Sequence, residues 1–282
     1  MINKKKVLIL GGEGFIGRNI ADYINHYYDC YSLGIKKSEF KKRKDKFIKL
    51  NPYKKAIKNN YDVIIHLIDN PVKIKDFSRE ERRLIKNLNL NKSNHLIIFS
   101  SAVVYANPNS EYGKRKLKLE KIYQDYCIKN NITLTILRLF NAYGPYQIPN
   151  RQGSLIANIL FNYLNNNEIV INDTMVKRDF IYSGDIAKFI NYAIKNKSNG
   201  IIDLATGRLT KIKELLYIIK NEIIGKDLLI NNKKIAETLK CPVGKRFFSR
   251  EIVTTPLKDG IFKTLDFYKK NNKLINKLNR HV

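Results

Sequence analysis

Short apolar runs alternate with helix-length segments along the first half of the chain. Between the first two runs, Ile16, Ile20 and Ile24 recur at helical spacing within residues 15–27. Strands separated by helices need crossover connections, so this rhythm predicts a doubly wound, parallel α/β sheet. Ligands of such sheets bind beyond the carboxyl ends of the strands. The runs that predict strands are 6–10, 31–35, 46–50, 62–68, 95–100 and 132–139.

The rhythm changes after Gly144-Pro145, where a polar stretch begins. We expect one sheet domain over residues 1–145, which the chain re-enters at about 180–206 through a helix and a strand. Residues 146–179 and 207–282 then form a smaller C-terminal lobe. The elements predicted for this lobe are helices near 154–165, 211–224 and 257–268 and a short strand over 168–171.

A glycine-rich turn, Leu10-Gly11-Gly12-Glu13-Gly14-Phe15-Ile16-Gly17, joins the first predicted strand to the first predicted helix. The spacing of Gly11, Gly14 and Gly17 lets a diphosphate approach backbone N–H groups at a helix N-terminus. The positive end of the helix dipole favours such an anion. A strand, this turn and a helix in that order predict a Rossmann-like domain that binds a dinucleotide cofactor.

A second group of polar residues offers proton-transfer chemistry. Ser100-Ser101 ends a predicted strand, and Tyr112 and Lys116 lie four residues apart on a predicted helix, where they share one face. A tyrosine phenol, with an ordinary pKa of about 10, is a poor base at neutral pH. A nearby ammonium favours the phenolate, so Lys116 would make Tyr112 a better proton acceptor.

Taken in order, these motifs resemble those of the extended short-chain dehydrogenase/reductases, the NAD(P)-dependent nucleotide-sugar epimerase/dehydratase family. The turn matches the family pattern Gly-x-x-Gly-x-x-Gly. The resemblance implies that Ser101 orients the reacting sugar oxygen, that Tyr112 transfers the proton and that Lys116 also binds the nicotinamide ribose. Ser100 is the alternative to Ser101, since one residue of alignment separates them. Further matching motifs lie at 62–67, 99–105, 112–116, 138–145 and 178–185.

The same resemblance assigns binding residues and a partner. Asn141 and Arg178 match positions that contact a nucleotide-diphosphate sugar, and Arg178 would bind its diphosphate, because the guanidinium fork suits phosphate oxygens. Arg246 is a looser match for a second phosphate contact in the substrate-binding lobe. Helices such as 112–130 often form the dimer contact in this family, so we expect a homodimer. The expected cofactor contacts are Gly11, Gly14, Phe15, Ile16, Gly17, Lys36, Lys37, Leu67, Ile68, Ser100, Tyr112 and Lys116.

The end of the second predicted strand bears on the choice of cofactor. Gly34 stands where NAD-dependent relatives usually have an acid that binds the ribose 2′-hydroxyl, and Lys36 and Lys37 follow. The missing acid would remove repulsion against a 2′-phosphate. The sequence therefore favours NADP(H) over NAD(H).

Two enzyme activities fit these residues. Dehydratases of the family carry an Asp-Glu pair just after the catalytic serine or threonine, and here Ala102 and Val103 take those places, which disfavours 4,6-dehydration. Because Gly34 favours NADPH, we expect a reductase of 4-keto sugar nucleotides with Tyr112 as the proton donor. The alternative is a nucleotide-sugar C4 epimerase with retained NAD.

The charge of the chain raises an alternative of another class. The 282 residues include 53 Lys and Arg against 25 Asp and Glu, a formal net charge of +28. Some relatives are non-catalytic cofactor sensors or RNA-binding proteins, and a strongly basic surface is typical of nucleic-acid binding. The lysines, however, are spread among Asn and Ile residues along the whole chain, and Ser101, Tyr112 and Lys116 are all present. We therefore expect an enzyme that does not bind nucleic acid.

The cysteines, histidines and apolar runs argue against a disulfide-rich, a metal-binding or a membrane-spanning protein. Cys30, Cys127 and Cys241 form no paired or metal-type spacing, which fits a reducing cytoplasm. The four histidines form no metal-ligand pattern, and His66 at the end of an apolar run is expected to be a packed structural residue. No apolar run is long enough to cross a bilayer. We expect a cytoplasmic protein without a metal or a membrane span.

Overall fold

The computed structural model describes residues 4–40, 45–69, 74–91, 94–149, 155–225, 227–232 and 252–280. The chain divides into two compact units, one of Met1–Leu139 with Ile186–Asp203 and the other of Phe140–Asp185 with Leu204–Val282. The boundaries predicted from the sequence, at 145, 180 and 206, lie a few residues from these. Arg246 and Cys241 lie outside the described residues, as do residues 41–44, which are four consecutive basic residues.

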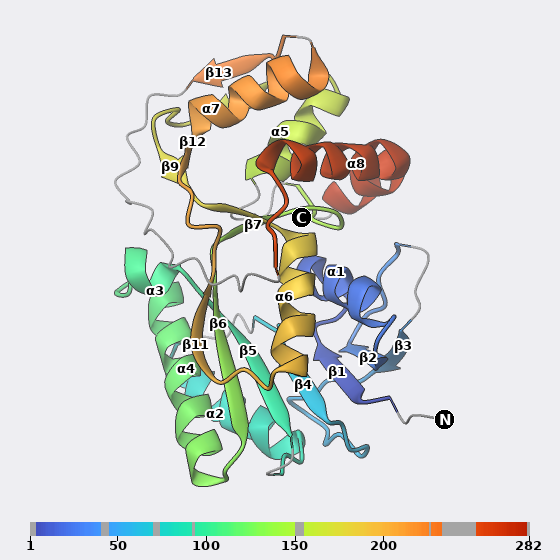
Figure 1. Ribbon diagram of the computed structural model, residues 1–282, viewed down its shortest axis with the longest axis vertical. Helices are drawn as coiled ribbons and strands as arrows, with labels where there is room; N and C mark the ends of the chain where they lie inside the picture. The colour runs from blue at the N-terminus through green and yellow to red at the C-terminus, as the bar shows by residue number, and fades with distance from the viewer. Residues whose placement is uncertain are drawn as a thin grey trace. The chain divides into compact units, whose positions relative to one another are not determined.

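The first unit is built on a Rossmann-like sheet. Its strand order is β11-β6-β5-β4-β1-β2-β3 within the described part of the chain, and every pair among β1 to β6 is parallel (Figure 1). The connections reverse direction between β1 and β4, and ligands of such sheets bind at that point. The strands are β1 Lys6–Leu10, β2 Asp29–Gly34, β3 Lys46–Lys49, β4 Val63–His66, β5 His95–Ser101, β6 Thr133–Leu139 and β11 Gly200–Leu204.

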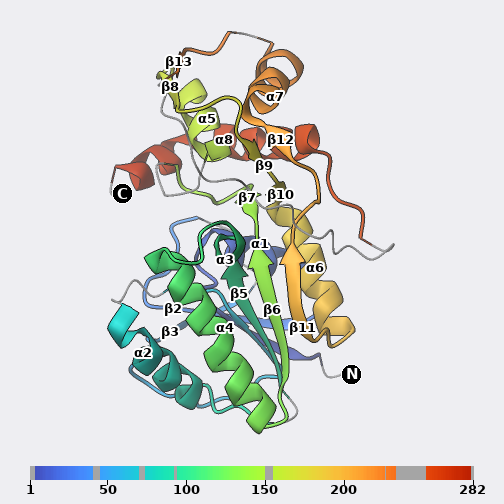
Figure 2. The ribbon, with the colours of Figure 1, turned by 90° about the vertical axis from the view of Figure 1, so that its left-hand side faces the viewer.

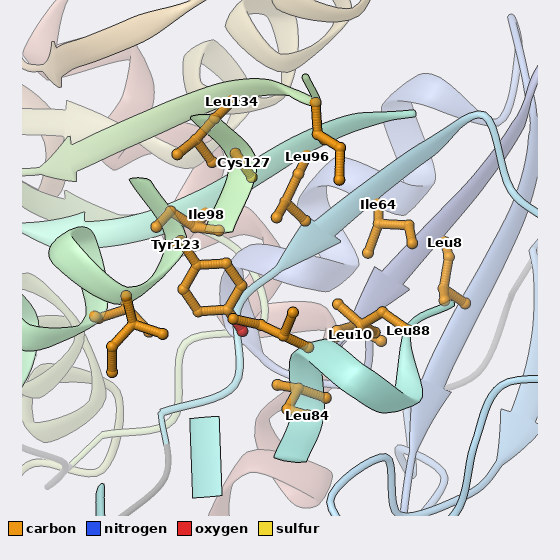
Figure 3. Close-up of a cluster of buried hydrophobic side chains, with 14 of the residues drawn as sticks. Leu8, Leu10, Ile64, Leu84, Leu88, Leu96, Ile98, Tyr123, Cys127 and Leu134 are labelled. Carbon is orange, nitrogen blue, oxygen red and sulfur yellow. The ribbon is translucent and has the colours of Figure 1, made fainter. Parts of the chain in front are cut away.

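Helices cover both faces of this sheet, as a doubly wound fold requires (Figures 1 and 2). On one face α2 and α4 pack together, and their apolar side chains bury those of β1, β4 and β5 (Figure 3). On the other face lie α1 and α6, where Ile20, Ile24 and Phe189 are fully buried. The predicted α/β sheet is therefore confirmed. The helices are α1 Phe15–Ile24, α2 Ile74–Asn87, the short α3 Val103–Ala106, α4 Glu111–Lys129 and α6 Ser183–Lys195.

Among its described residues, the second unit combines three strand pairs with helices. β7 runs parallel to β10, β9 antiparallel to β12, and β8 parallel to β13. The strands are β7 Asn141–Tyr143, β8 Ile169–Ile171, β9 Lys177–Arg178, β10 Phe180–Tyr182, β12 Thr210–Lys211 and β13 Ile230–Asn232. The helices are α5 Leu155–Leu164, α7 Ile212–Tyr217, which continues as the π-helical η1 Ile218–Ile224, and α8 Leu257–Asn279.

The last helix is longer than the sequence pattern predicts. It was expected to end near residue 268, but α8 continues to Asn279, with a kink at Asn271. Ile275 in the added part is buried, and the Asn276 side chain donates a hydrogen bond to Asn165, next to α5. The second half of α8 has a polar composition that is not typical of a buried helix. Its helical structure therefore depends on packing against the rest of the second unit. None of the helices described is long and apolar enough to span a membrane.

Candidate active site

The glycine-rich turn is held between the ends of β1 and β2. Gly11 has a φ of +79°, in the left-handed region that glycine tolerates best. Its N–H donates to the carbonyl of Leu33 in β2, at 3.0 Å, and the Gly14 N–H donates to the Gly11 carbonyl, also at 3.0 Å. Gly14 is the N-cap residue of α1. The turn thus leads directly from β1 to the N-terminus of a helix.

Two of these glycines are required by close packing. A Cβ at Gly17 would lie 2.5 Å from the Gly11 carbonyl oxygen, and one at Gly12 would lie 2.2 Å from the Ser32 hydroxyl oxygen. Around Gly14 the nearest atom would be 3.4 Å away, so the outer side of the turn is open. The first turn of α1 carries no acidic side chain. Its N–H groups and helix dipole therefore suit the diphosphate of a dinucleotide, with Phe15 and Ile16 at the site.

The end of β4 lies beside this turn. A Cβ at Gly11 would lie 3.4 Å from both the Ile68 nitrogen and the Leu67 carbonyl carbon. His66 holds this segment, because its Nδ1 accepts the Ile68 N–H at 3.3 Å. The His66 ring is 2% exposed, and its Nε2 lies 3.3 Å from a carboxylate oxygen of Glu81. The structure thus brings the predicted contacts Leu67 and Ile68 to the glycine turn, with His66 as a buried support.

The two serines at the end of β5 have different surroundings. Ser100 is buried and donates to the Glu120 carboxylate at 2.5 Å. Ser101 is half-buried, and its Oγ accepts the Val103 N–H at 3.2 Å. A hydroxyl already committed to a buried carboxylate cannot readily orient a substrate. This arrangement favours Ser101 over Ser100 as the residue that touches substrate.

Tyr112 and Lys116 lie in the first two turns of α4. Ser110 caps this helix, since its hydroxyl accepts the Gly113 N–H at 3.0 Å. The Lys116 Nζ lies 5.4 Å from the centroid of the Tyr112 ring. The lysine is 7% exposed, and its ammonium contacts the Phe99 carbonyl and a carboxylate oxygen of Asp69, each at 3.4 Å. Asp69 follows β4, so this ion pair joins α4 to the strand end that carries Leu67 and Ile68.

An ion pair between the buried Glu120 and the half-buried Arg138, which the sequence pattern does not indicate, fixes α4 against β6. Arg138 binds Glu120 through two parallel hydrogen bonds, from Nε at 3.0 Å and from Nη2 at 2.7 Å. The carboxylate raises the pKa of the Arg138 guanidinium further. Nη1 of Arg138 donates to the Tyr105 hydroxyl at 2.7 Å, and that hydroxyl donates to Asp203 at 2.9 Å. Glu120 is one helical turn beyond Lys116, so the network also fixes the position of Lys116.

Two further predicted substrate residues, Asn141 and Arg178, belong to the second unit. Asn141 lies in β7, and its side-chain amide donates to the Asp179 carbonyl at 3.2 Å. Arg178 lies in β9, half-buried. Asp179 is fully buried and accepts hydrogen bonds from the Thr206 N–H, the Thr206 hydroxyl and the Gly207 N–H. Burial raises the pKa of the Asp179 carboxyl. Asp179 is thus a structural anchor beside Arg178.

The cysteines and the possible metal ligands among the described residues provide neither a reactive thiolate nor a metal site. Burial raises the pKa of the Cys30 thiol to about 12 and that of the Cys127 thiol to about 11, so neither forms a reactive thiolate at neutral pH. Across the described ranges, no three His, Cys, Asp or Glu side chains are grouped as ligands of a metal ion.

The fold and the order of these motifs define the class of the protein as an extended short-chain dehydrogenase/reductase. The family model described as "NAD dependent epimerase/dehydratase family" matches residues 7–205. The chain belongs to this family of nucleotide-sugar enzymes.

Individual relatives agree with this assignment. A protein of Methanocaldococcus jannaschii named "Putative UDP-glucose 4-epimerase" is 30% identical, over 77% of this chain and 82% of its own. UDP-N-acetylglucosamine 4-epimerase from Methanobrevibacter ruminantium, solved with UDP-N-acetylmuramic acid, has a TM-score of 0.78 at 22% identity and covers 96% of this chain and 100% of its own. dTDP-glucose 4,6-dehydratase from Bacillus anthracis, solved with NAD, has a TM-score of 0.76 at 17% identity. The match covers 95% of this chain and 98% of the dehydratase chain. The fold is thus shared by epimerases and dehydratases.

Proposed function

We propose that the chain is a nucleotide-sugar C4 epimerase that retains its dinucleotide cofactor. The observation that carries the proposal is the pairing of Tyr112 with a buried Lys116 on α4, tied through Asp69 to the strand end beside the glycine turn. The 30% identity to a protein named as a 4-epimerase supports this reaction. The sequence alone favoured reduction and placed epimerisation second. We now propose epimerisation first.

Each residue has a role in this reaction. Bound in the site, the cofactor would accept a hydride from C4 of the sugar and return it to the opposite face. Tyr112 as phenolate takes the proton of the C4 hydroxyl and later gives it back. The Lys116 ammonium stabilises the phenolate, and Ser101 hydrogen-bonds the same sugar oxygen. Asn141 and Arg178 bind the nucleotide-sugar, with Arg178 at the diphosphate.

Dehydration is disfavoured by the residues after Ser101. Ala102 donates its N–H to the Leu139 carbonyl, and Val103 begins α3. Neither side chain carries a group that could act as an acid or a base. Water elimination from the sugar needs both an acid and a base. At these positions the chain lacks the acidic pair that dehydratases of the family carry.

The second candidate function is the reduction of a 4-keto sugar nucleotide. It uses the same Ser101, Tyr112 and Lys116, but the cofactor is consumed. Gly34 at the end of β2 and the exposed Lys36 and Lys37 favour it, because they suggest a site open to the 2′-phosphate of NADPH.

A direct assay separates these functions. The purified protein is incubated with UDP-glucose or UDP-N-acetylglucosamine without added cofactor, and the products are separated by chromatography. Formation of the C4 epimers supports the epimerase. Oxidation of NADPH in step with loss of a 4-keto sugar nucleotide, without epimer formation, supports the reductase instead. Tight RNA binding with neither turnover would favour the non-catalytic alternative.

A further inference from the structure

The end of β2 lacks a side chain, and the structure shows what fills the space. A Cβ at Gly34 would lie 3.3 Å from Cγ of Glu13, a residue of the glycine-rich turn. Such a contact is tighter than most contacts of real Cβ atoms, so Gly34 makes room for Glu13. The two positions are far apart in the sequence, but the turn and β2 are joined by the hydrogen bond from the Gly11 N–H to the Leu33 carbonyl.

The Glu13 carboxylate is held in place there. Oε2 of Glu13 accepts the N–H of Ser38 at 2.6 Å, which ties the side chain to the segment after β2. The Glu13 side chain is half-buried. A carboxylate has about four acceptor positions, so Glu13 can accept hydrogen bonds from a pair of ribose hydroxyls in addition to those from protein groups such as the Ser38 N–H.

We propose that Glu13 supplies the acid that the end of β2 lacks, and that it makes the cofactor site select NAD(H) over NADP(H). In Rossmann-like domains the acid at the end of the second strand binds the ribose hydroxyls and repels a 2′-phosphate. A carboxylate that reaches the same place from the glycine turn performs both tasks. This proposal reverses the preference inferred from Gly34 alone.

The lysines after β2 do not outweigh this carboxylate. Lys36 and Lys37 are exposed, so water and salt screen their charges. The group that Lys36 directs toward the position of a Gly34 side chain is its carbonyl oxygen, 3.7 Å from the Cβ position. A carbonyl is an acceptor, so it cannot hydrogen-bond a phosphate dianion. A 2′-phosphate at this spot would meet the Glu13 carboxylate and the Lys36 carbonyl together.

The proposal rests on the proposed function only in that the chain binds a dinucleotide. Its test is therefore a titration of NADH and NADPH into protein freed of bound nucleotide, followed by cofactor fluorescence, with no sugar nucleotide present. We expect the wild type to bind NADH at least tenfold more tightly than NADPH, because hydrogen bonds to charged groups and like-charge repulsion both act in that direction. Tighter binding of NADPH by the wild type would overturn the proposal.

Variants locate the preference in one residue. Glu13→Gln keeps an oxygen for the Ser38 N–H but removes the charge, and it should reduce the ratio of the two affinities at least tenfold. Glu168→Gln removes an equally negative, exposed side chain from the second unit and should leave the ratio unchanged. An unchanged ratio in Glu13→Gln would contradict the proposal.

A relocated acid distinguishes charge from loop structure. The double variant Glu13→Ala with Gly34→Asp places a carboxylate at the end of β2, where the next atoms, 3.7 and 3.8 Å from the Cβ position, leave ordinary contact distances. It should regain the preference for NADH that Glu13→Ala loses. Failure to regain it, in a variant that unfolds cooperatively, would mean that Glu13 acts by shaping the turn, and the proposal would be wrong. Because no substrate is used, lack of epimerase activity does not affect any of these outcomes.

Discussion

At the residue scale, the environment of a few side chains distinguishes residues that the sequence alone does not. Ser100 and Ser101 are adjacent in the sequence, and the motif alone leaves open which of them contacts the substrate. The structure separates them, because the Ser100 hydroxyl donates to the buried Glu120 carboxylate while Ser101 is half-buried at the end of β5. The Glu13 carboxylate beside Gly34 is a similar case, since only the folded chain brings these two positions together.

Tyr112→Phe should lose most turnover while the cofactor affinity stays unchanged. The variant keeps the aromatic ring near Lys116 but removes the hydroxyl that carries the proton. General acid–base groups contribute about 100- to 10,000-fold in rate. Steady-state kinetics and a cofactor titration on the same preparation give both quantities. Turnover equal to that of the wild type, under conditions where chemistry limits the rate, would exclude Tyr112 as the proton carrier.

Arg178→Ala should weaken nucleotide-sugar binding at least tenfold and leave cofactor binding almost unchanged. A charge-assisted bond to phosphate contributes about 1.5–3 kcal/mol, and about 1.4 kcal/mol is a factor of ten in affinity. We expect the cofactor diphosphate to bind elsewhere, at the N-terminus of α1. Parallel calorimetric titrations with NADH and UDP separate the two effects. Equal losses for both ligands would instead assign Arg178 a role in folding.

At the element scale, the sequence predicted those elements whose apolar pattern is strong. The buried strands β1, β4 and β5 and the helix α1 follow directly from apolar runs and helical spacing. The second half of α8 was missed, because its support comes from tertiary contacts such as the bond between Asn276 and Asn165. The ion pair between Glu120 and Arg138 was missed for the same reason, since a pattern along one helix does not reveal its partner on a strand.

Glu120→Ala should destabilise the fold by about 3–5 kcal/mol, because it leaves the charge of Arg138 without its bidentate partner at a largely buried site. Asp125 on the same helix is a matched control. It pairs with Lys121 at 3.5 Å, and both side chains are more than half exposed. Asp125→Asn should change the free energy of unfolding by less than about 1 kcal/mol. Urea unfolding of both variants measures the difference, and equal effects would contradict a structural role for the pair.

At the scale of the whole molecule, the family match ends at residue 205, so most of the C-terminal part of the second unit lies beyond it. The glycine-rich turn and the residues predicted to be catalytic fall inside the match, and their roles stay predictions. The sequence motifs did not specify the sugar. The charge of +28 gave no reliable guide to function, since lysines are spread over the whole chain.

The stability of the molecule should depend on pH through His95. This side chain is 2% exposed, and burial lowers its pKa from 6.5 to about 4. Between these values the unfolded chain binds a proton that the folded chain does not, so the free energy of unfolding falls as the pH falls through this window. The expected loss from pH 7 to pH 4.5 is about 2–3 kcal/mol.

The variant His95→Gln isolates this contribution. Glutamine does not titrate, and its amide can still donate to the Thr135 hydroxyl, which lies 2.8 Å from Nε2 of His95. Urea unfolding at both pH values should show a smaller loss for the variant by about the same 2–3 kcal/mol. An identical pH dependence in the two proteins would show that His95 is not the titrating group.

We propose that the chain inverts C4 of a nucleotide sugar and keeps its cofactor throughout. The most direct test uses UDP-glucose or UDP-N-acetylglucosamine with deuterium at C4 and no added dinucleotide. If the same hydride leaves and returns, NMR will show the C4 epimer with deuterium still at C4. Absence of the epimer, together with deuterium transfer from labelled NADH or NADPH to a 4-keto sugar nucleotide, would contradict the claim and establish the reductase.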